Sequence, residues 1–119
     1  MKEIIAIIRP NMYFQTKEAL HNINIYSMNS QLVYGRGKNH DINLTINHGT
    51  TENKSIEGYS LLAKKQINIV ARDNDVQKIV DTIISTNSTN TSGDGKIFII
   101  PTEKVVRIRT GVCDDDALV

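Results

Sequence analysis

Apolar and polar positions along the first half of the chain predict a strand, a helix and a second strand. Residues 4–8 (IIAII) are apolar without a break, which is typical of a central strand, and Pro10 marks the end of that strand. Residues 13–23 have a weaker helical spacing, with Tyr13, Leu20 and Ile23 on one side. A mixed pattern over 27–35 predicts the next strand.

The second half repeats this order with clearer signals. Residues 61–71 alternate between polar and apolar and predict a half-buried strand. A helix follows, for which we expect Asp73 or Asn74 to be the N-cap. Its apolar residues recur at helical spacing and are Val76, Ile79, Val80, Ile83 and Ile84. Further strands are predicted over 96–100 and over 105–109, and the acidic tail of residues 110–119 is expected to be mobile or lightly docked.

The element order predicts an α/β (α+β) fold in a single domain of residues 1–119. Right-handed crossovers turn a βαββαβ order into a ferredoxin-like sandwich, with an antiparallel sheet and both helices on one face. The other face of the sheet is then left open. Because residues 4–8 are apolar throughout, an exposed face is unfavourable, and we expect one subunit to pack its sheet against another.

The polar segment between the two halves, about residues 37–58, has no sustained periodicity. Unstructured loops of this length are uncommon in compact domains and are usually functional or disordered. A simple insertion is the alternative interpretation. Because Gly35, Arg36, Gly37 and Lys38 precede it, we favour a functional loop that orders on binding.

Residues 87–96 form the strongest candidate for chemistry, because two glycines flank Asp94 and Lys96 follows at once. Glycines let backbone N–H groups converge on an anion, and the lysine supplies a positive charge. This is no Walker A loop, since Ile97 and a strand follow the lysine. A tight Asp-Gly turn and a phosphate-binding loop are equally compatible with these residues alone.

Arg107 and Arg109 are the second candidate for anion binding. On a strand, residues two apart point to the same face, roughly 7 Å apart. Two solvated charges on an open sheet face are the common interpretation, and an arginine pair aimed at a phosphate chain is the sharper one.

Composition narrows the function further. A net charge of +1 argues against general nucleic-acid binding, and no apolar run is long enough to span a membrane. The N-terminus lacks a signal-peptide pattern, and the single cysteine, Cys113, fits a reducing cytoplasm. His40 and His48 share the long loop. We interpret them as solvated histidines, which is a simpler interpretation than a metal site. We find no catalytic constellation and predict that the protein is no enzyme.

Five segments together resemble the PII nitrogen-regulatory signal proteins over essentially the whole chain. They are residues 4–10 (IIAIIRP), 35–37 (GRG), 61–64 (LLAK), 89–98 (TNTSGDGKIF) and 107–111 (RIRTG). The resemblance implies a trimer that holds ATP or ADP in clefts between neighbouring subunits. The residues that match the family's nucleotide site are Ile7, Gly35, Gly37, Lys38, Val70, Thr89, Gly93, Asp94, Gly95, Lys96, Arg107 and Arg109.

The resemblance also implies an effector site beside the nucleotide. Lys64 matches the residue that binds 2-oxoglutarate, beside a Mg²⁺ carried by the ATP phosphates. The positions expected around 2-oxoglutarate are Gly37, Asn39, Lys64 and Gly93. Asn39 replaces the usual metal-ligating glutamine and is one methylene shorter, so it reaches Mg²⁺ only if the backbone moves inward.

Other departures from the family concern the long loop, which is longer than in familiar bacterial members and lacks their modification site at Tyr59. Ala63 and Asn68 replace a common proline and glutamate. These features resemble the nitrogenase-associated branch of methanogenic archaea, in particular the longer of its two paralogs. That branch implies a homotrimer or a mixed hexamer with a PII-like paralog, and inhibition of the dinitrogenase component. A regulator of an ammonium transporter and a non-sensing assembly partner are the alternatives.

Overall fold

The computed structural model describes residues 1–37 and 61–118. The predicted functional loop after Gly37, with Lys38, Asn39, His40, His48 and Tyr59, lies outside the described residues. The elements in chain order are β1 (Lys2–Ile8), the 3-10 helix η1 (Pro10–Met12), α1 (Tyr13–Asn22), β2 (Asn29–Gly35), β3 (Leu62–Ala71), α2 (Asp73–Asn87), β4 (Lys96–Pro101) and the 3-10 helix η5 (Asp114–Leu118).

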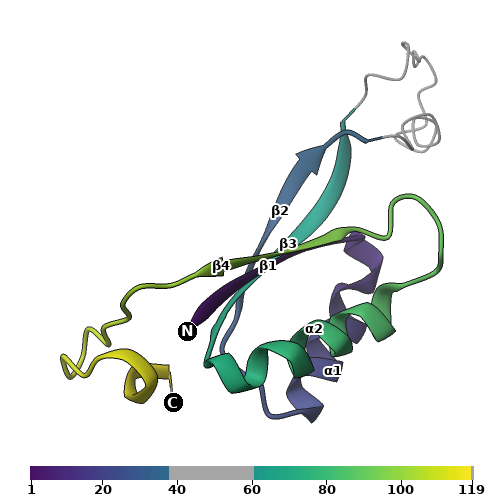
Figure 1. The fold of residues 1–119 in the computed structure, drawn as a ribbon. Helices are drawn as coiled ribbons and strands as arrows, with labels where there is room; N and C mark the ends of the chain where they lie inside the picture. Colours follow the sequence, from purple (N-terminus) through teal and green to yellow (C-terminus); the bar gives the residue numbers. More distant parts are fainter. Residues whose placement is uncertain (38–60, 119) are drawn as a thin grey trace.

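The sheet has four antiparallel strands in the order β2-β3-β1-β4, which confirms the ferredoxin-like prediction. Both helices lie against the same face (Figure 1). Because consecutive residues of a strand point to opposite faces, only every second residue of β1 reaches the helices. Ile4, Ala6 and Ile8 are buried there, whereas Ile5 and Ile7 are half-buried on the other face.

The core lies between the sheet and the two helices. Ile67 and Ile69 of β3 and Leu20 of α1 are buried in it, as are Ile79 and Ile83 of α2, which confirms the helical spacing of the apolar residues. On the open face, Phe98 and Ile100 of β4 remain exposed beside Ile5 and Ile7. This open face has the apolar character that led us to expect packing against another subunit.

A buried polar pair joins the two helices within this core. The side chain of Asn87 donates to the hydroxyl of Thr16 and to the carbonyl of Ile83, both at 3.0 Å. The Thr16 hydroxyl donates to the carbonyl of Met12 at 2.7 Å. Thr16 is fully buried, and its role was missed in the sequence because threonine does not stand out on a weakly periodic helix.

Replacing Thr16 by valine is expected to lower the free energy of unfolding by about 1–3 kcal/mol, because buried hydrogen bonds are lost without a change of volume. Urea denaturation measures the difference. Thr82→Val is the matched control, since its hydroxyl makes the same bond to a preceding carbonyl, that of Lys78, but in an exposed place. We expect a loss of at most about 0.5 kcal/mol in the control. Equal losses in the two variants would contradict a role for the buried pair.

The predicted strand over 105–109 is wrong. The segment leaves the sheet after Pro101 and turns back on itself, with a single bridge between Val106 and Cys113. The amide of Arg107 donates to the carbonyl of Val112 at 2.8 Å. A strand needs a neighbour for its backbone groups, and here the chain offers only its own hairpin-like return. The expectation that Arg107 and Arg109 share one face of a strand fails with it.

Two further boundaries, those of α2 and β2, differ from the sequence prediction. The N-cap of α2 is Arg72 rather than Asp73 or Asn74, and the carboxylate of Asp73 instead pairs with the amino group of Met1 at 2.9 Å and with Lys2 of β1 at 3.5 Å. β2 begins at Asn29, two residues later than predicted. The tail forms η5, to which Arg72 donates a hydrogen bond at the carbonyl of Asp115. Within residues 1–37 and 61–118, no helix has the length and apolarity needed to cross a bilayer.

Candidate functional site

A pocket of about 450 Å³ opens where the C-terminal ends of β1 and β2 meet the start of β3 and the loop before β4. The sheet register explains this meeting, since Ile7 pairs with Lys96 on one side and with Gln66 on the other. The residues that line the pocket are Ile7, Gly35, Arg36, Gly37, Leu62, Lys64, Ser92, Gly93, Gly95 and Lys96. Seven of these were expected at the nucleotide or 2-oxoglutarate site.

The loop that borders this pocket, residues 88–95, is organised around the carboxylate of Asp94. The backbone amide of Thr89 donates to Oδ2 at 2.6 Å, and its hydroxyl donates to Oδ1 at 2.5 Å. These hydrogen bonds, followed by that from Arg9, hold the pKa of Asp94 well below its usual range. The carboxylate therefore stays ionised, and its oxygens accept hydrogen bonds from within the loop and from Arg9. Asp94 and Thr89 were both expected to bind nucleotide, and in this structure they bond to each other.

Gly95 brings the loop against β1. Its φ of +118° is one that side chains rarely allow, and a Cβ at this position would overlap the carbonyl oxygen of Ile7. Gly93 also has a positive φ, of 100°. The loop thus leaves α2, turns through these glycines and enters β4 at Lys96, with its backbone facing the pocket. A glycine-rich backbone beside a lysine is a common setting for anion binding.

Lys64 reaches the same loop from β3. Its Nζ donates to the carbonyl of Gly93 at 2.8 Å. Burial, and after it the positive charge of Arg9, lowers the pKa of Lys64, while Asp94 opposes the shift. A half-buried lysine whose partner is a neutral carbonyl has a charge that an incoming anion can use.

The remaining expected residues lie at the opposite end of the sheet. Arg107 and Arg109 follow Pro101, and Arg107 donates to the carbonyl of Asp116 in η5 at 2.9 Å. β4 has six residues, so its two ends are roughly 17 Å apart at about 3.3 Å per residue. In Figure 1 the green loop and the yellow C-terminal segment accordingly lie at opposite ends of β4. One chain does not bring Lys96 and the arginine pair together.

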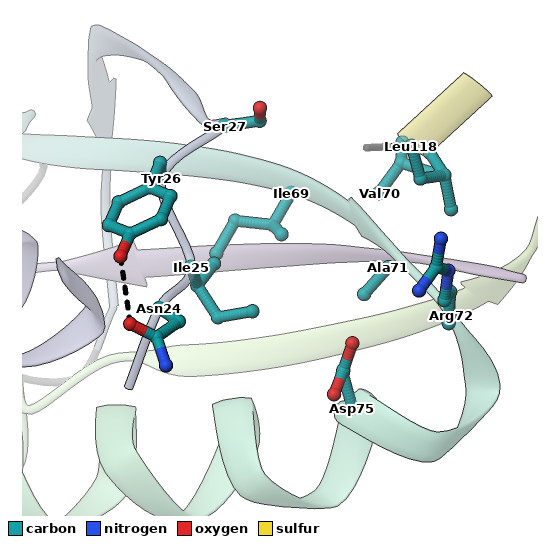
Figure 2. A pocket seen from close by; sticks show the side chains of 10 residues that line it. All are labelled: Asn24, Ile25, Tyr26, Ser27, Ile69, Val70, Ala71, Arg72, Asp75 and Leu118. Atoms are coloured by element: carbon teal, nitrogen blue, oxygen red, sulfur yellow. Dashed lines mark hydrogen bonds between the residues drawn. The ribbon is translucent and has the colours of Figure 1, made fainter. Parts of the chain in front are cut away.

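Val70 belongs to this second end, where it pairs with Glu3. It lines a separate pocket of about 290 Å³, between β3, the α1–β2 connection and the start of α2. Figure 2 shows Ile25 and Ile69 on one side of this pocket and Arg72 near Leu118 on the other. The hydroxyl of Tyr26 donates to Asn24 at 2.8 Å at its rim. The pocket is largely apolar with polar groups at its edge.

Sequence reasoning missed the role of Arg9 in the loop beside the first pocket. Its guanidinium contacts Asp94, Thr91 and Ser92, which are more than 80 residues away along the chain. In the sequence, its position directly after a central strand was the only feature that distinguished Arg9. Lys38 and Asn39, expected beside Gly37, fall outside the described part of the chain.

Comparisons with known proteins agree on one family. The model described as "Nitrogen regulatory protein P-II" matches residues 1–112. A "Nitrogen fixation nifHD region GlnB-like protein 2" of Methanobacterium ivanovii is 40% identical over 121 residues, which cover 99% of either chain. A "Nitrogen regulatory protein P-II" of the species Microchaete diplosiphon is 41% identical over 120 residues, covering 99% of this chain and 100% of the relative.

Among solved structures, PII of Arabidopsis thaliana bound to citrate superimposes with a TM-score of 0.75. The two chains are 29% identical, and the match covers 98% of this chain and 88% of the plant protein. The similarity to nitrogen-fixation relatives of methanogenic archaea also confirms the branch that the sequence features indicated.

Proposed function

This chain belongs to the P-II family of nitrogen regulatory proteins, and we propose that it binds ATP or ADP and 2-oxoglutarate to regulate nitrogenase. Members of the family are signal transducers rather than enzymes. The observation that carries the proposal is the pocket beside the 88–95 loop, where the backbone of Gly93 and Gly95 lies beside Lys96 and Lys64. Phosphates fit these donors, because they prefer positive charge and clustered N–H groups.

The nucleotide site is proposed to need two subunits. Lys96 and the arginine pair would contact the same phosphate chain, but they sit at opposite ends of β4 within one chain. A triphosphate is much shorter than that separation. A neighbouring copy that presents its own Arg107, Arg109 and Val70 to this pocket completes the site, and the apolar open face of the sheet favours such packing. We therefore propose a trimer; a mixed hexamer with a paralog is its variant.

The coupling to 2-oxoglutarate is proposed to run through Lys64. A dicarboxylate that pairs with this ammonium competes with the Gly93 carbonyl, so effector binding alters a contact that shapes the phosphate loop. Asn39 is the candidate ligand for an ATP-bound Mg²⁺. Gly37, Lys64 and Asn39 all lie at the start or base of the long loop, and ligands bound there shift its population toward one conformation. In the proposal only one such conformation docks on the dinitrogenase component and inhibits it, in the cytoplasm.

Calorimetry with MgATP, with and without 2-oxoglutarate, tests the proposal. We expect MgATP to bind and 2-oxoglutarate to bind only when MgATP is present. If MgATP does not bind, the non-sensing assembly partner becomes the better hypothesis. If MgATP binds and 2-oxoglutarate does not, the role of Lys64 and Asn39 is wrong. Inhibition of nitrogenase, relieved by 2-oxoglutarate, separates the proposed target from an ammonium transporter.

Lys96→Ala is expected to weaken ATP binding by about tenfold or more, since a charge-assisted contact of about 1.5–3 kcal/mol is lost. Calorimetric dissociation constants measure this effect. Lys104→Ala is the matched control, because Lys104 is an exposed lysine that lies outside the pocket. We expect its affinity to match that of the unmodified chain. An unchanged affinity in Lys96→Ala would remove the phosphate assignment of this lysine.

A further inference from the structure

Arg9 connects the end of β1 to the phosphate loop through three hydrogen bonds. Its Nη1 donates to Oδ1 of Asp94 at 2.5 Å. Its Nη2 donates to the hydroxyl of Thr91 at 3.2 Å and to the carbonyl of Ser92 at 3.0 Å. A guanidinium presents its donors in a fixed planar fork, so one side chain fixes three points of the loop at once.

The charge of Asp94 makes this contact more than a mechanical one. Asp94 sits between Gly93 and Gly95, both of which line the pocket, and its pKa is lowered so that it stays negative. A fixed negative charge beside a phosphate site repels the ligand. The ion pair with Arg9 is the closest compensation that the described residues offer, and both side chains are only partly exposed.

We propose that Arg9 is a positioning residue of the nucleotide site: it holds residues 89–94 in their binding shape and cancels the charge of Asp94. The proposal rests on the proposed binding of nucleotide at this pocket. Arg9 does not line the pocket and is not assigned a contact with the ligand. Its effect on affinity passes through Asp94 and the loop.

The first test needs no nucleotide. Hydrogen exchange, followed by mass spectrometry, measures the protection of residues 88–95, where the Thr89 amide donates to Asp94. Arg9→Met is expected to speed this exchange, and Arg9→Lys to have a smaller effect because it keeps the charge but loses the fork. Lys78→Met is the matched control, since Lys78 forms an ordinary surface ion pair with Asp75 at 3.3 Å. If Arg9→Met leaves the exchange of residues 88–95 unchanged, Arg9 does not hold this loop in shape, whether or not ATP binds.

The second test separates charge compensation from loop shape. ATP dissociation constants are measured for Arg9→Met, for Asp94→Asn and for the double variant, with circular dichroism to confirm that each is folded. We expect Arg9→Met to weaken binding by about tenfold or more. Asp94→Asn should weaken binding when Arg9 is present, because the ion pair with Arg9 is lost together with the charged acceptor of the Thr89 bonds. In the Arg9→Met background it should instead strengthen binding, because an uncompensated negative charge is removed.

That reversal of sign is the result that a purely structural role for Arg9 does not produce. If Asp94→Asn weakens binding in both backgrounds, charge compensation is wrong, and Arg9 acts only by holding the loop in shape. If Arg9→Met binds ATP as tightly as the unmodified chain does, Arg9 is no positioning residue. If the unmodified chain itself fails to bind ATP, the proposed function is wrong. The exchange experiment still measures whether Arg9 holds the loop in shape.

Discussion

Gly95→Ala is expected to abolish detectable ATP binding in a chain that still folds. A Cβ at this position overlaps the carbonyl oxygen of Ile7, which belongs to the central strand and does not move without breaking its pairing with β3 and β4. A φ of +118° adds a backbone cost of about 1–3 kcal/mol for any residue other than glycine. The loop must therefore lift away from β1, and Lys96 leaves the pocket with it.

Calorimetry with MgATP and thermal unfolding measure the two consequences. Gly111→Ala is the matched control, because Gly111 also has a positive φ, of 74°, but a Cβ there meets nothing within 4 Å. We expect a loss of stability of about 1–2 kcal/mol in the control, from backbone strain alone. A larger loss is expected in Gly95→Ala. Nucleotide affinity that survives in Gly95→Ala would mean that the loop does not bind the phosphates in this shape.

Two variants that each fail to bind ATP are expected to recover ATP binding when their chains are assembled together. One variant carries Lys96→Ala and the other carries both Arg107→Ala and Arg109→Ala. In homogeneous trimers each variant lacks half of every site. In trimers assembled from an equal mixture, a cleft is intact when it joins the loop of one variant to the arginines of the other, which random assembly produces in about one quarter of clefts.

The binding stoichiometry after co-refolding measures this recovery. Trimers mixed after folding, without exchange of chains, serve as the control and should bind no ATP tightly. A site built within one chain would show no recovery in either sample. That result would overturn the two-subunit site, whereas recovery would locate Lys96 and the arginine pair on different chains.

Much of the fold could be predicted because its signals are local. The helical spacing of Ile79 and Ile83 and the apolar run of β1 each indicate their element without reference to the rest of the chain. The segment at 105–109 has the composition of a strand and still forms none, because strand pairing depends on a partner that composition does not reveal. The N-cap of α2 was predicted wrongly for a similar reason, since the carboxylate of Asp73 pairs with the Met1 amino group and with Lys2, which are distant in sequence.

The site could be predicted only in part. Glycines and a lysine next to a strand mark the loop proposed to bind phosphate, and the structure brings them together with Gly35, Gly37 and Lys64 in one pocket. The contact between Arg9 and Asp94 spans 85 residues and has no signature in either segment. The distance between Lys96 and Arg107 could not be predicted from the sequence either. It follows from the direction of β4 and from the path of the segment after it.

The central position of β1 also affects how the chain is made. β1 is synthesised first, yet it pairs with β3 and with β4, which ends roughly 90 residues later. At about 5–20 residues per second, a ribosome needs roughly 5–18 s to complete that distance. Until β3 has been made, the apolar segment at 4–8 has no strand to pair with, and until β4 has been made one edge of β1 stays unpaired. Apolar segments left unpaired in this way are prone to aggregate. The strand that organises the finished sheet is thus the one that most needs shielding while the chain emerges.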